Sequence, residues 1–144
     1  MFIKSHIRGG FRAAADYLKE QGKNEKTKLI DISDVQARNL DEAFRAMWAI
    51  ADGSRAKKPL HHVSINPVKG ERLTVKQVKQ ICERLEQNYG YRSGEHQRVI
   101  VEHVLTGRQH FHVIWNRISL KTGKAHYPKL HKKTSKLTAR EMEI

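Results

Sequence analysis

The sequence predicts an α+β fold in which helices pack on a mixed or antiparallel β-sheet. Candidate strands alternate with amphipathic helices along the chain, and two β-rich segments are joined by a connection of hairpin length, Leu105 to Arg108. The 144 residues, 38% of them hydrophobic, suit one domain with a core of its own. We therefore expect a single domain over residues 1–144.

Five segments have the alternation or the composition of strands. Residues 1–7 alternate between two faces before Gly9 and Gly10 interrupt the pattern, and residues 60–66 alternate up to Pro67. Two later segments are rich in β-branched and aromatic residues. The predicted strands are residues 1–7, 29–32, 60–66, 97–104 and 110–119.

Three segments have the periodicity of amphipathic helices, over residues 11–22, 40–51 and 74–89. Asn39 or Asp41 can cap the second helix. Thr74 and Gln77 form the pattern of a capping box at the start of the third, and Gly90 follows its end.

The composition makes a polyanion the expected partner. Lys and Arg total 28 against 15 Asp and Glu, a formal charge of +13, and His103 to Arg140 contains 9 Lys or Arg without an acidic residue. A single cysteine, Cys82, excludes a disulfide framework and a multi-cysteine zinc site. No apolar run approaches the roughly 18 residues that span a bilayer, and the first residues do not resemble a signal peptide. We expect a soluble, cytoplasmic protein.

Three histidines are predicted to share one face of the sheet. If the hairpin turn is centred on Thr106 and Gly107, His103 pairs with His110, and His112 lies two residues further along the same face. Imidazole is the commonest protein ligand of divalent transition metals, and three ligands leave coordination positions open for a substrate. A partly solvated polar face is the alternative interpretation of the same pattern.

The segment that holds these histidines resembles the metal motif of the relaxase, or mobilisation nuclease, family of HUH endonucleases. It reads HVLTGRQHFHVIWNRIS, and its motif positions are His103, His110, His112, Asn116 and Arg117. Two other segments resemble further motifs of that family: KKPLHHVSINPVKGERLT, residues 57–74, and GGFRAAADYLKEQGK, residues 9–23. The closing TAREME resembles the start of the last helix of the family's domain.

The resemblance implies a fold and a chemistry. The fold is a central, largely antiparallel sheet of about five strands flanked by helices. Tyr17 would attack a DNA phosphodiester at an origin of transfer, giving a 5′-phosphotyrosine and a free 3′-hydroxyl. The three histidines would hold one divalent ion, Mg²⁺ or Mn²⁺. The spacing of Tyr17 from Phe11 and Ala14 would also suit simple packing on the core side of the helix.

The same resemblance implies a biological setting. The substrate would be single-stranded or extruded DNA, and the protein would be bacterial and encoded by a plasmid or another mobile element. Accessory mobilisation proteins and a type IV secretion coupling protein are the expected protein partners. Because the chain stops just inside the expected last helix, the resemblance leaves two interpretations, a nuclease domain that is truncated at its C-terminus or a short member of the family.

The motif departs from the family at three positions. Leu105 stands where an acidic residue is frequent, and Gly107 and Arg108 stand where another acid and another histidine are frequent. Glu71, in the GERLT segment, could orient a histidine in place of the missing acid, and an exposed loop carboxylate is the alternative interpretation. The remaining site predictions are residues that would contact DNA. They are Ser64, Asn116, Arg117, Lys57, Lys58, Arg92, Lys121 and Lys124.

Two alternative functions remain open at this stage. The chain could be a basic module that binds single-stranded DNA and has lost its cleavage site, as the departure at Leu105 suggests. It could also be a replication initiator or transposase, in which the nucleophile follows the histidines; Tyr127 would then be the candidate, although Pro128 disfavours a helix there.

Overall fold

The computed structural model describes residues 1–18 and 26–143. These residues form five strands and four helices. The strands are β1 (Phe2–Arg8), β2 (Lys26–Ser33), β3 (Leu60–Asn66), β4 (Arg98–Leu105) and β5 (Arg108–Asn116). The helices are α1 (Phe11–Leu18), α2 (Leu40–Asp52), α3 (Val75–Tyr89) and α4 (His131–Met142).

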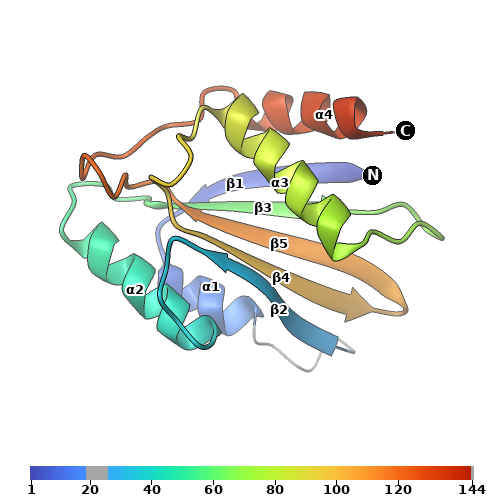
Figure 1. The fold of residues 1–144 in the computed structure, drawn as a ribbon, viewed down its shortest axis with the longest axis horizontal. Coiled ribbons are helices and arrows are strands. Elements are labelled where there is room, and N and C mark those ends of the chain that lie inside the picture. Colours follow the sequence, from blue (N-terminus) through green and yellow to red (C-terminus); the bar gives the residue numbers. More distant parts are fainter. Residues whose placement is uncertain (19–25, 144) are drawn as a thin grey trace.

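The strands form a single antiparallel sheet in the order β1-β3-β5-β4-β2 (Figure 1). The predicted α+β fold with a central antiparallel sheet is confirmed. β1 and β2 are the edge strands, and β5, which carries His110 and His112, is the central strand. β5 is buried from Phe111 to Asn116, as expected for a strand with neighbours on both sides and helices on both faces.

Helices cover both faces of the sheet, and alternate residues of each strand enter two separate cores (Figure 1). On one face, Ile100, Val113 and Trp115 pack with the apolar sides of α3 and α4. On the other face, Val101 and Ile114 pack with α1 and α2. The histidines of β4 and β5 share this second face, beyond the area that α1 and α2 cover.

The ends of the helices follow the sequence signals. Asn39 caps α2 by accepting a hydrogen bond from Glu42 N, and Thr74 and Gln77 form the predicted capping box of α3. Gly90 ends α3 in the left-handed conformation, with φ of 84°. None of the helices in the described ranges is long and apolar enough to cross a membrane.

Two predicted strands differ from the observed ones by more than one residue at an end, and one predicted helix extends beyond the described residues. The first helix is described as far as Leu18, so the predicted residues 19–22 lie outside the described part of the chain. β2 is longer than residues 29–32 because its ends also pair with β4. The last strand stops at Asn116 rather than at residue 119, because the backbone N–H of Arg117 donates to Pro59 O and leaves the ladder.

Candidate active site

The β4–β5 hairpin places three histidines on one face of the sheet, in the predicted register. Thr106 and Gly107 form a two-residue turn with positive φ at both positions, 51° and 74°. This backbone twist matches that of antiparallel strands. His103 pairs with His110, and the ring centroids of His103 and His112 are 4.6 Å apart.

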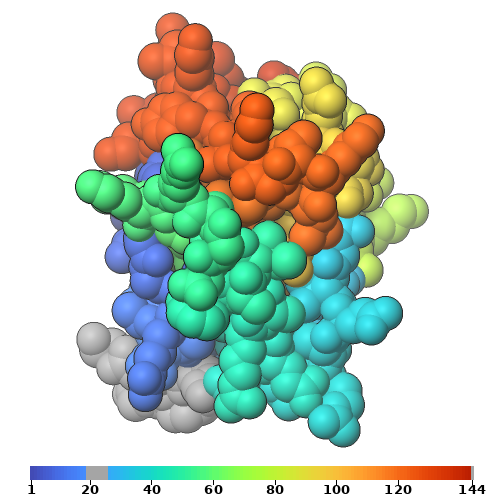
Figure 2. Space-filling model, turned by 90° about the vertical axis from the view of Figure 1, so that its left-hand side faces the viewer, coloured from blue at the N-terminus to red at the C-terminus, as the bar shows by residue number. Residues whose placement is uncertain are grey.

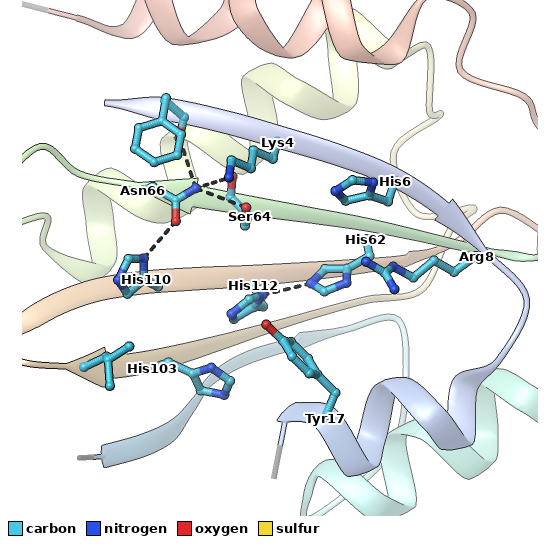
Figure 3. A pocket seen from close by; sticks show the side chains of 12 residues that line it. Lys4, His6, Arg8, Tyr17, His62, Ser64, Asn66, His103, His110 and His112 are labelled. Atoms are coloured by element: carbon cyan, nitrogen blue, oxygen red, sulfur yellow. Dashed lines mark hydrogen bonds between the residues drawn. The ribbon is translucent and has the colours of Figure 1, made fainter. Parts of the chain in front are cut away.

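Tyr17 reaches this face from the end of α1. Its ring is edge-on to two imidazoles, with centroids 5.8 Å from His112 and 6.2 Å from His62. The side chain is 52% exposed, which argues against a packing role, and Figure 3 shows its hydroxyl directed toward His112. A sharp turn after β1 brings α1 over the sheet. Gly9 lies in this turn, close to the backbone of Lys57: a Cβ at Gly9 would lie 3.1 Å from the Lys57 carbonyl oxygen.

Tyr17 and the three histidines line one pocket of about 390 Å³ (Figure 3). The rest of its wall comes mainly from the two strands at the β1 edge of the sheet. The full lining is Phe2, Lys4, His6, Arg8, Tyr17, His62, Ser64, Asn66, His103, Leu105, His110 and His112. The described lining includes Lys4 and Arg8 but no Asp or Glu, so the pocket presents positive charge and imidazoles to a ligand.

Hydrogen bonds determine which nitrogen of two histidines is free. The Nδ1–H of His110 donates to Asn66 Oδ1 (2.8 Å), and the Nε2–H of His103 donates to the Leu18 carbonyl (2.8 Å), since both oxygens can only accept. A neutral imidazole then keeps a lone pair on its other nitrogen. His62 Nε2 and His112 Nδ1 share a third hydrogen bond of 2.8 Å.

His62, His110 and His112 favour the neutral form, which is the form that binds metals. Burial lowers the pKa of His112 to about 2, and the charges of His62, His103 and His110 add to the effect. Burial likewise lowers the pKa of His62 to about 4 and lowers that of His110. Neutral imidazoles need not release a proton before they can act as ligands.

The donor set suits a divalent ion, but the rings are not arranged around one point. Among the described residues, no three His, Cys, Asp or Glu side chains are positioned to hold an ion together. His103 and His112 each use one ring nitrogen for a protein partner. Coordination by all three histidines therefore requires binding through their remaining nitrogens or rotation of the His103 ring away from Leu18 O.

Two predicted DNA contacts are instead bound within the protein. Asn116 lies on the histidine face but is fully buried; its Nδ2 donates to Met47 O and Gln97 Oε1, and its Oδ1 accepts from Ile118 N. Arg117 is also buried, donates to the carbonyls of Lys58 and His126, and lies over the Tyr127 ring. Their contacts give both residues a structural role at the end of β5.

The predicted basic contacts lie away from the pocket, with Ser64 alone among the predicted DNA contacts lining it. Lys57 and Lys58 precede β3, and Lys121 and Lys124 follow β5, so these four lie at the end of the sheet opposite the hairpin. Figure 2 shows that end, with the segment after β5 in orange and the segment after α2 in green. Arg92 lines a different recess, next to α3.

Glu71 also lies outside the pocket. It accepts a hydrogen bond from Val68 N (3.3 Å), and its carboxylate is 3.8 Å from the amino group of Met1. It lines a separate recess beside the hairpin turn. In the structure the partner that orients His110 is Asn66, so the predicted role of Glu71 has no supporting contact among the described residues.

The other three tyrosines are poorly placed to serve as the nucleophile. Tyr89 and Tyr91 are buried on the α3 face, and burial raises the pKa of Tyr89 to about 12 and raises that of Tyr91 as well. Tyr127 is exposed but contacts Arg117 and His131 and does not line the histidine pocket. Tyr17 is the tyrosine that the geometry favours.

The sequence interpretation missed several residues of the pocket. Asn66 was a strand end only, and His62 had no assigned role. Lys4 and His6 lie on the predicted strand over residues 1–7 but have no predicted function, and Arg8 lies just outside that strand. The available signal is the alternation of residues 2, 4 and 6, but what their shared face lies against depends on the pairing of β1 with β3.

One comparison with known proteins gives a match. A family model described as relaxase, MobA/VirD2-like, nuclease domain, matches residues 17–144. The match includes Tyr17, all three histidines and every strand except β1. No curated protein shows a significant match to the chain.

Proposed function

Because the chain belongs to the relaxase family of MobA/VirD2-like nuclease domains, we propose that it is a metal-dependent nickase that cuts one DNA strand at a specific site through Tyr17. The observation that carries this proposal is the position of Tyr17, whose exposed ring stands 5.8 Å from His112, beside the face that His103 and His110 share. A DNA endonuclease needs a nucleophile and a means of neutralising a phosphate, and this pocket offers both.

Tyr17 would form a covalent intermediate with DNA. Its hydroxyl oxygen would bond to phosphorus while the bond from phosphorus to the 3′ oxygen breaks. The phenol would lose its proton, and the leaving 3′ oxygen would take up a proton and become the 3′-hydroxyl. The product keeps a phosphodiester on the tyrosine, so the strand can later be rejoined. Because the Tyr17 side chain is exposed, a phosphate would reach its hydroxyl from the open side of the pocket.

His103, His110 and His112 would hold one divalent ion, Mg²⁺ or Mn²⁺. When bound there, the ion would polarise the scissile phosphate and neutralise the charge that develops during attack. Asn66 would hold the His110 ring so that Nε2 faces the pocket, and burial would keep His110 and His112 neutral. Lys4 and Arg8 add positive charge to the same pocket.

The setting of the reaction is proposed on the same basis. The substrate would be single-stranded or extruded DNA at an origin of transfer, because attack in line with the leaving oxygen needs access that a paired strand restricts. A plasmid or another mobile element would encode the protein, and accessory mobilisation proteins and a secretion coupling protein would be its partners in the cell.

A covalent-capture experiment tests the proposal. A labelled pool of random single-stranded oligonucleotides is incubated with the protein and Mn²⁺ or Mg²⁺, and adducts that survive denaturation are isolated and sequenced. We expect an adduct with the 5′ phosphate of the fragment that lies 3′ of the nick in one preferred sequence, and its loss on chelation. Tyr17→Phe should abolish the adduct and leave binding intact, and Tyr127→Phe is the matched control, which should retain it.

The second candidate function is a DNA-binding module without cleavage. The lack of a carboxylate in the described lining of the pocket favours it, because the family frequently has an acid where this chain has Leu105. That function predicts normal binding of the same oligonucleotides without an adduct in any divalent metal. Loss of the adduct in Tyr127→Phe but not in Tyr17→Phe would instead support the initiator or transposase alternative.

A further inference from the structure

The edge strand β1 carries a row of exposed side chains along the rim of the pocket. Phe2, Lys4, His6 and Arg8 alternate with the more buried Ile3, Ser5 and Ile7. In an extended strand, side chains two residues apart point to the same face and lie about 6.6 to 6.8 Å apart. Figure 3 shows Lys4, His6 and Arg8 spaced along this strand above the histidines.

The register across the sheet sets these residues beside the proposed chemistry. Lys4 pairs with Ser64, which pairs with His112, so the three stand in one row across β1, β3 and β5. His6 pairs with His62 in the next row, and His62 neighbours Tyr17. A chain that follows β1 would therefore pass along the imidazoles and the tyrosine.

The charges along β1 are not neutralised by the pocket. The strand contains no acidic residue, and none occurs in the described lining. The pKa of His6 is lowered by burial first and then by Arg8, Lys132 and Lys4, which indicates a positive local field. Such a field favours an anion that extends along the strand, rather than a single point charge.

The aromatic end of the row offers a surface for a base. Phe2 is 45% exposed, and Lys4 Nζ lies 5.5 Å from its ring centroid, so an apolar ring and a cation stand side by side at the rim. Alternating cations and aromatic rings are what single-stranded nucleic acids need, because the backbone is negative and every base has a face that stacks.

We propose that β1 is the binding track for the unpaired strand next to the nick site, with Lys4 and Arg8 each binding a phosphate and Phe2 stacking on a base. This inference rests on the proposed function, because the nick site is taken to lie at Tyr17. β1 lies outside the residues that the family model matches, so the track comes from the geometry of this chain alone.

The salt dependence of binding tests the track. Affinity for a labelled random single-stranded oligonucleotide is measured over a range of salt concentrations, in the full chain with Tyr17→Phe and without divalent metal. Each lost phosphate contact should reduce the slope of log K against log salt by about 0.7, so Lys4→Gln with Arg8→Gln should reduce it by about 1.4. Phe2→Leu should weaken binding about tenfold and leave the slope unchanged.

The matched control removes the same charges from the other face of the sheet. Lys76→Gln with Arg140→Gln changes exposed residues of α3 and α4 and should leave the slope near that of the parent. An equal loss of slope in both pairs, an unchanged slope in the Lys4 and Arg8 pair, or no binding would overturn the track. Because no adduct forms under these conditions, failure of the nickase chemistry shows only in the capture experiment.

Discussion

Single contacts decide how the pocket histidines are oriented, and Asn66 is the clearest case. Its Oδ1 accepts from His110 Nδ1, while its Nδ2 donates to Ser64 and to the Phe2 carbonyl. One amide therefore fixes a ligand candidate and links β1 to β3. In families with an acid in the histidine motif, a carboxylate can orient a ligand; here a neutral amide from a neighbouring strand has the contact.

Asn66→Ala should weaken Mn²⁺ binding about 10-fold to 100-fold, since a ligand that loses its orienting partner typically costs that much affinity. Asn66→Asp should recover most of the loss, because a carboxylate oxygen can accept from His110 Nδ1 as Oδ1 does. Calorimetric titration of the whole protein with Mn²⁺ measures both values. Equal affinities in the parent and in Asn66→Ala would show that the contact does not position a ligand.

At the scale of elements, the β4–β5 hairpin sets the register on which the site depends. A shift by one residue would turn His110 and His112 to the α3 face. The turn is strained at Thr106, a β-branched residue with φ of 51°, whereas Gly107 tolerates φ of 74°. The eight residues of β4 all pair with β5, and this pairing fixes the register although the turn is strained at Thr106.

Thr106→Asn should stabilise the protein by about 1 kcal/mol, because asparagine adopts left-handed backbone at lower cost than threonine. Urea denaturation measures the change, and Gly107→Ala, which adds a Cβ at positive φ, should shift the midpoint the opposite way. Stabilisation by Gly107→Ala, or destabilisation by Thr106→Asn, would contradict this description of the turn.

The hairpin is also the part of the site that the sequence predicts best. A two-residue turn leaves one register for His103 and His110, so local sequence is sufficient. The partners of those histidines are not local. Asn66 and His62 meet His110 and His112 only because β3 pairs with β5, and sequence alone does not give strand order.

The same limit explains why the predicted basic residues do not line the pocket. Lysines near the histidines in sequence, such as Lys121, follow β5 out of the sheet, whereas Lys4 comes from the distant N-terminus and lies in the His112 row. The motif resemblance of Asn116 and Arg117 likewise does not give their contacts within the protein, because Asn116 donates to Met47 O and Arg117 to His126 O, both outside β5.

At the scale of the whole molecule, a buried histidine on the α3 face makes folding sensitive to acid. His61 is fully buried, bonded through Nε2 to Ser5 and through Nδ1 to Tyr91, and burial lowers its pKa from 6.5 to about 2. Below pH 6.5 the unfolded chain takes up a proton that the folded protein excludes. The free energy of unfolding therefore falls as the pH decreases through that range.

The wild-type protein should lose stability below pH 6.5, and His61→Gln should lose less. The difference in slope between the two should approach about 1.4 kcal/mol per pH unit, the value for one proton. Urea denaturation at several pH values between neutrality and pH 4 measures it. Parallel pH profiles would mean that His61 binds protons equally in the folded and unfolded states.

The central claim is that His103, His110 and His112 share one ion beside the Tyr17 hydroxyl. A crystal structure with Mn²⁺, located by its anomalous scattering, tests this most directly. We expect one peak next to Tyr17, coordinated by one nitrogen of each imidazole. If His103 coordinates through Nε2, its ring gives up the hydrogen bond to the Leu18 carbonyl. A crystal in which Mn²⁺ binds elsewhere, or in which the three rings keep separate partners at saturating Mn²⁺, would contradict the account.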